Sequence, residues 1–193
     1  MEKTKTPLLL IISCLLTAAA AADSEAIWFE NICQGKENLL KLNLYVQDIR
    51  GGPSATVYRV AEASITSNSP SNFGMIHVVD NLVTAEPDIN SAAVGRAQGL
   101  ATFADLQTWA TAENINFVFT AGEFNGSTIT TIGRNPVVSP ERELAVAGGT
   151  GAFRFARGYA ITSTYSDDAV ADSSVLQYTF YMTRYDGASR AGV

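Results

Sequence analysis

Short apolar runs and turn-forming residues alternate along most of this 193-residue chain. Within many runs, apolar and polar side chains alternate residue by residue, which is the period of a β-strand with one buried face. Residues 39–49 are the first example, because Leu42, Leu44 and Val46 lie two positions apart and Asp48 continues the same face. An acid at the end of an apolar strand face is a candidate functional residue.

Turn signals such as Gly51-Gly52-Pro53 separate these runs, and no segment has the pattern of a long amphipathic helix. Residues 104–112 fit either a short helical turn or a continued strand. Eight or more short strands predict an all-β single domain, an antiparallel sandwich or barrel. We predict strands at 39–49, 56–63, 73–82, 94–103, 115–119, 127–132, 143–147, 152–164 and 175–184.

Residues 115–165 combine strand-like runs with Gly, Asn and Pro turns, and arginines stand beside the turns. We interpret this stretch as barrel wall with a pocket at one mouth. Its segment Gly148-Gly149-Thr150-Gly151 is not followed by Gly-Lys-Ser/Thr or by a helix, so it predicts a tight hairpin with positive φ, not a phosphate loop. Arg96, in a Gly-Arg-Ala-Gln-Gly segment, is interpreted as a tie between strands.

The chain begins with the pattern of a secretory signal peptide at residues 1–22, in which lysines precede an apolar run and a group of alanines. We expect a flexible N-terminal arm at 23–38, the barrel at 39–186 and a C-terminal tail at 187–193. The protein is therefore expected to be secreted, with no membrane attachment after cleavage. Cys33 is the only cysteine beyond the signal, which excludes an intramolecular disulfide in the mature chain.

Composition excludes some function classes. Hydrophobic residues make up 47% of the chain and charged residues 17%, which indicates a folded protein. The net charge of −6, without a cluster of Lys or Arg, argues against nucleic-acid binding. Asn125-Gly126-Ser127 is an N-glycosylation sequon, although Asn-Gly also simply favours a turn.

Standard catalytic sets and metal sites are poorly supported. His77 is the only histidine, and its position within a strand predicts a packed or edge side chain and not a base. Metal sites built from several His or Cys are excluded by count, so no metal is expected. The acids Asp167, Asp168 and Asp172 predict a solvated turn and not a calcium site.

What remains is Asp48 together with arginines near turns, and a barrel mouth could gather them. Such a pocket suits a phenolic or planar ligand, which apolar walls hold and a few polar groups orient. A carboxyl group in an apolar pocket can exchange protons, whereas an exposed Asp48 at a strand end would be idle. The arginines are Arg134, Arg142, Arg154 and Arg157.

Six blocks of the sequence resemble the plant dirigent protein family, in the family's order. They are LNLYVQDI (42–49), VVDNLVT (78–84), VGRAQGL (94–100), FVFTAGEFNGSTITTIGRNPV (117–137), RELAVAGGTGAFRFARGYA (142–160) and VLQYTFYMTRY (175–185). The NGST, GRNP and GGTG segments are similar to the dirigent-like branch. This resemblance implies an eight-stranded antiparallel β-barrel, a homotrimer, in the apoplast or cell wall.

The resemblance also implies a function. Lignan-forming members contain no redox cofactor, and they direct the stereoselective coupling of phenoxy radicals that a laccase or peroxidase generates from monolignols such as coniferyl alcohol. Pterocarpan synthases of the same family instead remove water and close a ring through a quinone methide. A third alternative is a cell-wall defence protein that binds phenolics without chemistry. No cofactor is expected under any of the three.

Four residues correspond to the family's site. The aspartate of the first strand falls on Asp48, the expected catalytic residue, and the histidine before it is Gln47 here. Arg142 and Thr164 match the family's arginine and threonine, and they are expected to bind substrate. Asn135 stands where lignan-forming members have a second acid, so it can donate a hydrogen bond to a phenol but cannot transfer a proton.

Overall fold

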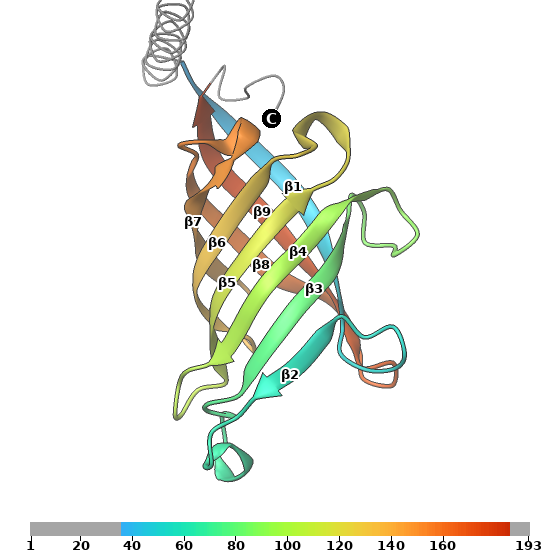
Figure 1. Ribbon diagram of the computed structural model, residues 1–193, viewed down its shortest axis with the longest axis vertical. Coiled ribbons are helices and arrows are strands. Elements are labelled where there is room, and N and C mark those ends of the chain that lie inside the picture. The colour runs from blue at the N-terminus through green and yellow to red at the C-terminus, as the bar shows by residue number, and fades with distance from the viewer. Residues whose placement is uncertain (1–35, 186–193) are drawn as a thin grey trace, which may run out of the picture. The chain divides into compact units, whose positions relative to one another are not determined.

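The computed structural model describes residues 36–185, in which nine β-strands form one antiparallel sheet with three short 3₁₀ helices in the connections (Figure 1). The strands are β1 (Glu37–Ile49), β2 (Val57–Ala61), β3 (Ile76–Thr84), β4 (Ala93–Phe103), β5 (Ala110–Phe119), β6 (Thr128–Pro136), β7 (Arg142–Thr150), β8 (Arg157–Asp168) and β9 (Ser173–Tyr185). The 3₁₀ helices are η1 (Thr66–Asn68), η2 (Gly122–Phe124) and η3 (Gly151–Phe153). Within residues 36–185 no helix has the length and hydropathy of a membrane span.

The sheet closes on itself because β1 pairs with two partners. The strand order is β1-β9-β8-β7-β6-β5-β4-β3-β2, and β1 also pairs with β3 from Tyr45↔Thr84 to Gln47↔Leu82. Beyond that point β2 takes over the edge of β3, starting at Val57↔Val79. Eight strands therefore close an antiparallel barrel and β2 lies beside it, which confirms the predicted fold class.

Several predicted boundaries are wrong. Strand β1 begins at Glu37, inside the predicted arm, and β5 begins at Ala110, so residues 104–109 are a loop. Strand β8 extends to Asp168, which shortens the predicted acidic turn. The remainder of the arm, the signal peptide, Cys33 and the C-terminal tail lie outside the described residues.

The predicted tight hairpin at the glycine-rich segment is also wrong. Strand β7 runs through Thr150, and the chain then turns in η3 before β8 starts at Arg157. Gly148 and Gly151 do have positive φ, at 135° and 59°. The turn is wider because η3 packs against the start of β6, and the Ala152 amide donates to Oγ of Ser127, the residue before β6, at 3.0 Å.

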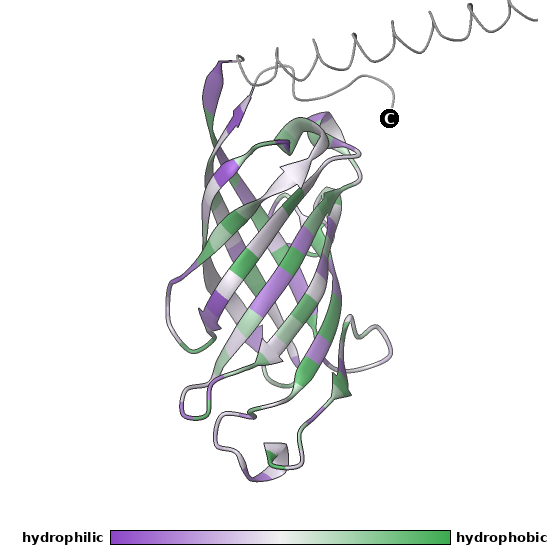
Figure 2. Cartoon of the chain, turned by 60° about the vertical axis from the view of Figure 1, so that its left-hand side comes forward, coloured by the Kyte–Doolittle hydropathy of each residue, from purple (hydrophilic) through white to green (hydrophobic). Residues whose placement is uncertain are grey.

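Aromatic side chains fill one half of the barrel. The rings of Phe119, Phe124 and Phe153 contact one another with centroids 4.8–5.7 Å apart, next to η2 and η3. Phe117 packs against Phe180 in the next layer at 5.0 Å. Figure 2 shows that hydrophobic and hydrophilic residues alternate along the strands. The buried members of this alternation face the barrel interior. The half of the barrel away from η2 and η3 is left for a cavity.

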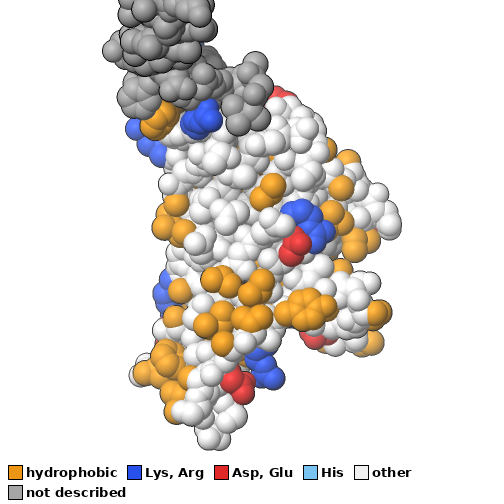
Figure 3. Space-filling view, viewed as in Figure 1, with side chains coloured by type: hydrophobic (Ala, Val, Ile, Leu, Met, Phe, Trp, Pro, Cys, Tyr) orange, Lys and Arg blue, Asp and Glu red, His pale blue; other side chains and the backbone are white. Residues whose placement is uncertain are grey.

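The outer wall carries a row of five cross-strand neighbours, of which four are apolar and the β5 member, Asn114, is polar; we call it the outer apolar row. Cross-strand pairing joins Tyr58 to Val78, Val78 to Leu100, Leu100 to Asn114, and Asn114 to Ile132. The four apolar members are 41–59% exposed. Figure 3 shows hydrophobic side chains gathered over this part of the surface. Exposed apolar side chains that adjoin one another in this way can mark a contact surface.

Candidate functional site

A cavity of about 610 Å³ occupies the half of the barrel that the phenylalanines leave open. It lies where β1, β6 and β8 end and where β3, β5, β7 and β9 begin, and its volume is typical of small-molecule sites. Most of its lining is apolar. The apolar side chains are Val46, Val57, Met75, Val79, Ala97, Ala101, Phe103, Trp109, Ile115, Val137, Ala169 and Leu176.

Asp48 anchors one polar cluster in this cavity. Its Oδ2 accepts a hydrogen bond from Arg50 Nη1 at 2.9 Å, and its Oδ1 accepts one from Asn81 Nδ2 at 2.9 Å. The amide of Asn81 is oriented in turn by Thr56, whose hydroxyl donates to Asn81 Oδ1 at 2.5 Å. We call Asp48, Arg50 and Asn81 the Asp48 cluster. The carboxylate is held in a fixed position with its charge balanced by the guanidinium.

Arg50 also ties the cavity mouth together. Its Nε donates to Asp172 Oδ1 at 3.0 Å, its Nη2 donates to Asp167 Oδ1 at 3.2 Å, and its Nη1 donates to Ser174 Oγ at 2.7 Å. The hydrogen bond from Ser174, together with the one from Arg50, lowers the pKa of Asp167. The acids at the β8–β9 connection thus bind Arg50, and these ion pairs hold the connection next to Asp48.

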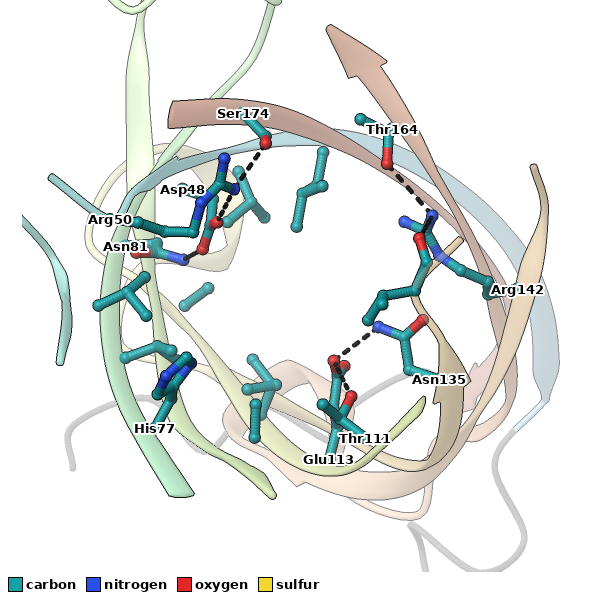
Figure 4. A pocket seen from close by; sticks show the side chains of 18 of the residues that line it. Asp48, Arg50, His77, Asn81, Thr111, Glu113, Asn135, Arg142, Thr164 and Ser174 are labelled. Carbon is teal, nitrogen blue, oxygen red and sulfur yellow. Dashed lines mark hydrogen bonds and ion pairs between the residues drawn. The ribbon is translucent and has the colours of Figure 1, made fainter. Parts of the chain in front are cut away.

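A second cluster, the Glu113 cluster, lies on the opposite side of the cavity (Figure 4). Glu113 Oε1 accepts hydrogen bonds from Asn135 Nδ2 at 2.6 Å and from Thr111 Oγ1 at 2.9 Å. Strands β5 and β6 bring these residues together, because Thr111 pairs directly with Asn135. Burial raises the pKa of Glu113 above its ordinary value, and the two hydrogen bonds oppose this only in part.

Arg142 and Thr164 lie beside the Glu113 cluster (Figure 4). Arg142 is 4% exposed, and its Nη1 donates to the carbonyl oxygens of Val137 at 3.3 Å and Ser139 at 3.1 Å and to Thr164 Oγ1 at 3.2 Å. None of the carboxylates in the described residues forms an ion pair with it. A buried guanidinium held by neutral acceptors is a strong donor for a ligand oxygen.

Two further titratable side chains face the cavity. His77 packs edge-on against Phe103, with ring centroids 5.8 Å apart, and burial lowers its pKa. Tyr178 lies at the bottom, where burial raises its pKa. At neutral pH both side chains are therefore uncharged. The packed position of His77 agrees with the prediction from the sequence.

The structure brings all four residues predicted for the site into this one cavity: Asp48, Asn135, Arg142 and Thr164. Gln47 faces away, because its amide donates to Thr84 Oγ1 at 2.9 Å and to the Pro87 carbonyl at 3.1 Å. The roles expected of the four cavity residues stay predictions.

The other predicted polar residues lie elsewhere. Arg134, Arg154 and Arg157 do not line the cavity, and Arg134 instead forms an ion pair with Asp105 at 2.8 Å. Asn125 is exposed in the turn between η2 and β6, near the aromatic half of the barrel. Of the candidate arginines, only Arg142 contributes to the cavity.

Arg96 is a strand tie, as predicted from the sequence. Its Nε donates to Asp80 Oδ1 at 2.8 Å, and this hydrogen bond lowers the pKa of Asp80.

Sequence reasoning missed Glu113, Arg50 and Asn81. A signal for Glu113 was available, because Thr111, Glu113, Ile115 and Phe117 follow a period of two and share the inner face of β5. The predicted strand started at Ile115, so Glu113 fell between it and the undecided segment at residues 104–112. Arg50 gave no such signal, since its partner Asp172 is 122 positions away.

Comparisons with known proteins agree with this fold. A family model described as "Dirigent-like protein" matches residues 39–183. Dirigent protein 11 of Arabidopsis thaliana is 47% identical over 146 residues, which cover 76% of this chain and 75% of the relative. Pterocarpan synthase 1 of Glycine max is 36% identical, with coverage of 78% and 81%.

Solved structures lead to the same family. The structure of the pterocarpan synthase dirigent protein GePTS1 is similar with a TM-score of 0.72 and 34% sequence identity, and the match covers 79% of this chain and 93% of that one. The corresponding structure of PsPTS1 gives a TM-score of 0.71 and 35% identity. By sequence and by fold, this chain is a member of the dirigent protein family.

Proposed function

We propose that this protein binds phenoxy radicals in its barrel cavity and directs their stereoselective coupling. The radicals come from monolignols such as coniferyl alcohol, and a separate laccase or peroxidase generates them. The protein itself supplies orientation: it holds two reactants so that one pair of faces meets. With this function, the protein would act in lignan or phenylpropanoid biosynthesis, like the lignan-forming members of the family.

The arrangement of the cavity carries this proposal. Two hydrogen-bonding clusters stand on opposite sides of one apolar space, so a planar phenol has both a place for its ring and partners for its oxygens (Figure 4). Stereoselectivity needs little energy, because a preference of ten to one corresponds to about 1.4 kcal/mol. One net hydrogen bond contributes about as much. A few fixed donors and acceptors therefore suffice to select one product.

A second candidate function is the cyclisation of a phenolic alcohol through a quinone methide, with loss of water. It is favoured by the similarity to pterocarpan synthases and by Glu113, a buried acid that radical orientation does not itself require. Such a reaction needs an acid for the leaving hydroxyl and a base for the phenol. Asp48 and Glu113 face the same cavity and could divide these tasks.

Three assays on the same preparation distinguish the candidates. Coniferyl alcohol is incubated with a limiting one-electron oxidant, with and without the protein, and the enantiomers of the coupled products are separated by chiral chromatography. An enantiomeric excess that rises with protein concentration supports radical guidance. Racemic products refute it for this substrate. Turnover of an isoflavanol without oxidant supports cyclisation, and saturable phenol binding without either activity supports a binding protein.

We also propose that the protein assembles into a homotrimer. The support is the outer apolar row, which one subunit leaves exposed and which a neighbouring subunit could bury. Light scattering should give about three times the mass of the monomer. A single species at the monomer mass would contradict the proposal.

We further propose secretion to the apoplast and glycosylation at Asn125. The support is the signal-like pattern at residues 1–22 and the exposed position of Asn125 in a turn. Protein recovered from the extracellular fluid of plant tissue should lose mass on treatment with a glycosidase that removes N-glycans. An Asn125→Gln variant of the same protein should have the lower mass without treatment.

A further inference from the structure

We propose that Glu113 is a second catalytic acid of the cavity, whose carboxyl group donates a proton to an oxygen of the bound phenolic substrate. This inference rests on the proposed function, because it requires that the cavity binds phenols. It assigns proton donation to a residue of β5, whereas Asn135, at the position of the family's second acid, cannot supply a proton.

The two oxygens of Glu113 have different surroundings. Oε1 accepts two hydrogen bonds, from Asn135 and from Thr111. Oε2 is buried and has no hydrogen-bond partner. No ion pair to Glu113 is formed by any cation in residues 36–185. A buried carboxylate without a paired cation is costly, so burial raises the pKa of Glu113 and favours the protonated form, although the hydrogen bonds from Asn135 and Thr111 and the charge of Arg142 oppose this in part. Oε2 is the oxygen free to carry the proton.

Two neighbouring groups complete a site for a hydroxyl. Asn135 Oδ1 and Arg142 Nε are also buried without a hydrogen-bond partner. Figure 4 shows Glu113, Asn135 and Arg142 next to one another on the same side of the cavity. A phenol or alcohol oxygen can accept two hydrogen bonds and donate one. Such an oxygen would accept from Glu113 and Arg142 and donate to Asn135, so all three buried groups become satisfied.

Asp48 is suited to the opposite role. Both of its oxygens accept hydrogen bonds, and one of the donors is the guanidinium of Arg50. The cavity therefore holds one carboxyl group that is paired with a cation and one whose burial favours the protonated form. Two acids in unlike environments are the arrangement that separates a base from an acid.

The proton transfers balance in the cyclisation. Glu113 protonates the leaving hydroxyl as its bond to carbon breaks, Asp48 takes the phenol proton, and water and a quinone methide result. A second hydroxyl then adds to the methide carbon and gives its proton to Glu113, while Asp48 returns its proton to the quinone oxygen. One water is lost and nothing is oxidised. After radical coupling the quinone methide is already formed, so the roles follow the starting states: Asp48 takes the proton of the attacking hydroxyl, Glu113 protonates the quinone oxygen, and proton exchange with water restores both groups.

The test begins with the carboxyl group itself. Protein labelled with ¹³C at the glutamate carboxyl is titrated by NMR, and the spectrum of Glu113→Gln assigns the resonance. We expect Glu113 to titrate above the ordinary value of 4.5 and its resonance to shift when coniferyl alcohol saturates the cavity. The exposed Glu143, on the outer face of β7, is the control and should not respond. Titration at the ordinary value, or no response to coniferyl alcohol, overturns the assignment.

Kinetics then test proton donation. The wild-type kcat/KM with an isoflavanol should fall at high pH as Glu113 loses its proton. Glu113→Gln should lose about 10²- to 10⁴-fold in kcat with little change in KM, and Glu113→Asp should recover part of the rate together with the pH dependence. Full activity of Glu113→Gln overturns the inference. If the wild type neither cyclises the isoflavanol nor gives chiral products, the proposed function fails, and the NMR titration still decides the state of Glu113.

Discussion

Replacement of Asp48 by Asn is the perturbation whose consequences follow most directly from the structure. The carboxylate accepts from two donors, Arg50 Nη1 and Asn81 Nδ2, each at 2.9 Å. An asparagine amide offers an oxygen to only one of them, and its own NH₂ group then faces the other donor. Asp48→Asn therefore removes a charge and at least one hydrogen bond while it keeps the volume of the side chain.

The cost in stability is moderate. A hydrogen bond to a charged group contributes about 1.5–3 kcal/mol when it is buried. The side chain of Asp48 is 16% exposed and that of Arg50 is 33% exposed, so solvent screens the pair. Arg50 also keeps its hydrogen bonds to Asp172 and Ser174. We expect Asp48→Asn to lower the free energy of unfolding by about 1–2 kcal/mol, small enough for the protein to fold.

The cost in function is larger, because the amide cannot accept a proton. Loss of a general base typically reduces the rate about 10²- to 10⁴-fold. Binding of the phenol should change by only a few fold, since the apolar walls and the Glu113 cluster are unchanged. With an isoflavanol and no oxidant, kcat should therefore fall by this factor. In the coupling assay, which depends on orientation, the enantiomeric excess should fall only in part, because Asp48→Asn removes one of the fixed polar groups.

The assay needs unfolding and product measurements on the same preparations. Urea unfolding gives the stability, and chiral chromatography with a limiting oxidant gives the enantiomeric excess. Asp80→Asn is the matched control, because Asp80 also forms an ion pair with an arginine, Arg96, at 2.8 Å but lies on the outer face. Asp48→Asn with wild-type enantiomeric excess and rate would refute the role assigned to Asp48. If Asp80→Asn lost as much activity as Asp48→Asn, the loss in Asp48→Asn would be explained by lower stability and not by a missing base.

Four further predictions concern the fold and its assembly. Glu113→Gln should be more stable than the wild type at pH 7 but not below pH 4.5. Between the ordinary pKa and the raised pKa of Glu113, the carboxyl ionises only in the unfolded wild type, which lowers the wild-type free energy of unfolding by up to about 1.4 kcal/mol per pH unit. Urea unfolding at both pH values measures this difference. Phe153→Ala should lower the free energy of unfolding by about 3–5 kcal/mol without loss of selectivity per folded molecule, since Phe153 is fully buried in the aromatic half of the barrel. Gly99→Ala should prevent soluble expression or strongly lower Tm, because an added Cβ would overlap the carbonyl oxygen of Asn114 in β5. A variant with a normal Tm would contradict the β4–β5 register. If the protein forms the proposed trimer, Leu100→Glu should reduce the mass in light scattering to that of a monomer, and an unchanged mass would place the interface elsewhere.

The barrel could be predicted because its physics is local. Alternation at Leu44, Val46 and Asp48 fixes which side chains face inward, and this placed Asp48 correctly in the interior. Turn residues between the strands indicated antiparallel neighbours. The family's sequence blocks then located Arg142 and Thr164, whose contact across β7 and β8 the structure shows at 3.2 Å.

The remaining features depend on contacts distant in sequence. Phe124 of η2 and Phe153 of η3 are buried and fill one half of the barrel, so the cavity lies in the other half. Neither short helix has a sequence pattern strong enough to predict it. Arg50 comes directly after β1, and it forms hydrogen bonds with residues at the β8–β9 connection, which are far away in the sequence. Glu113 was within reach of sequence reasoning, but its meaning depends on the β5–β6 register that places it against Asn135.

A crystal structure of the protein with coniferyl alcohol tests the central claim most directly, because that claim concerns where a phenol lies. The account predicts the aromatic ring between the apolar walls of the cavity, with one oxygen in hydrogen-bond contact with Arg142 or Glu113 and another facing the Asp48 cluster. A ligand bound on the outer wall, or in the cavity without contact to either cluster, would contradict it.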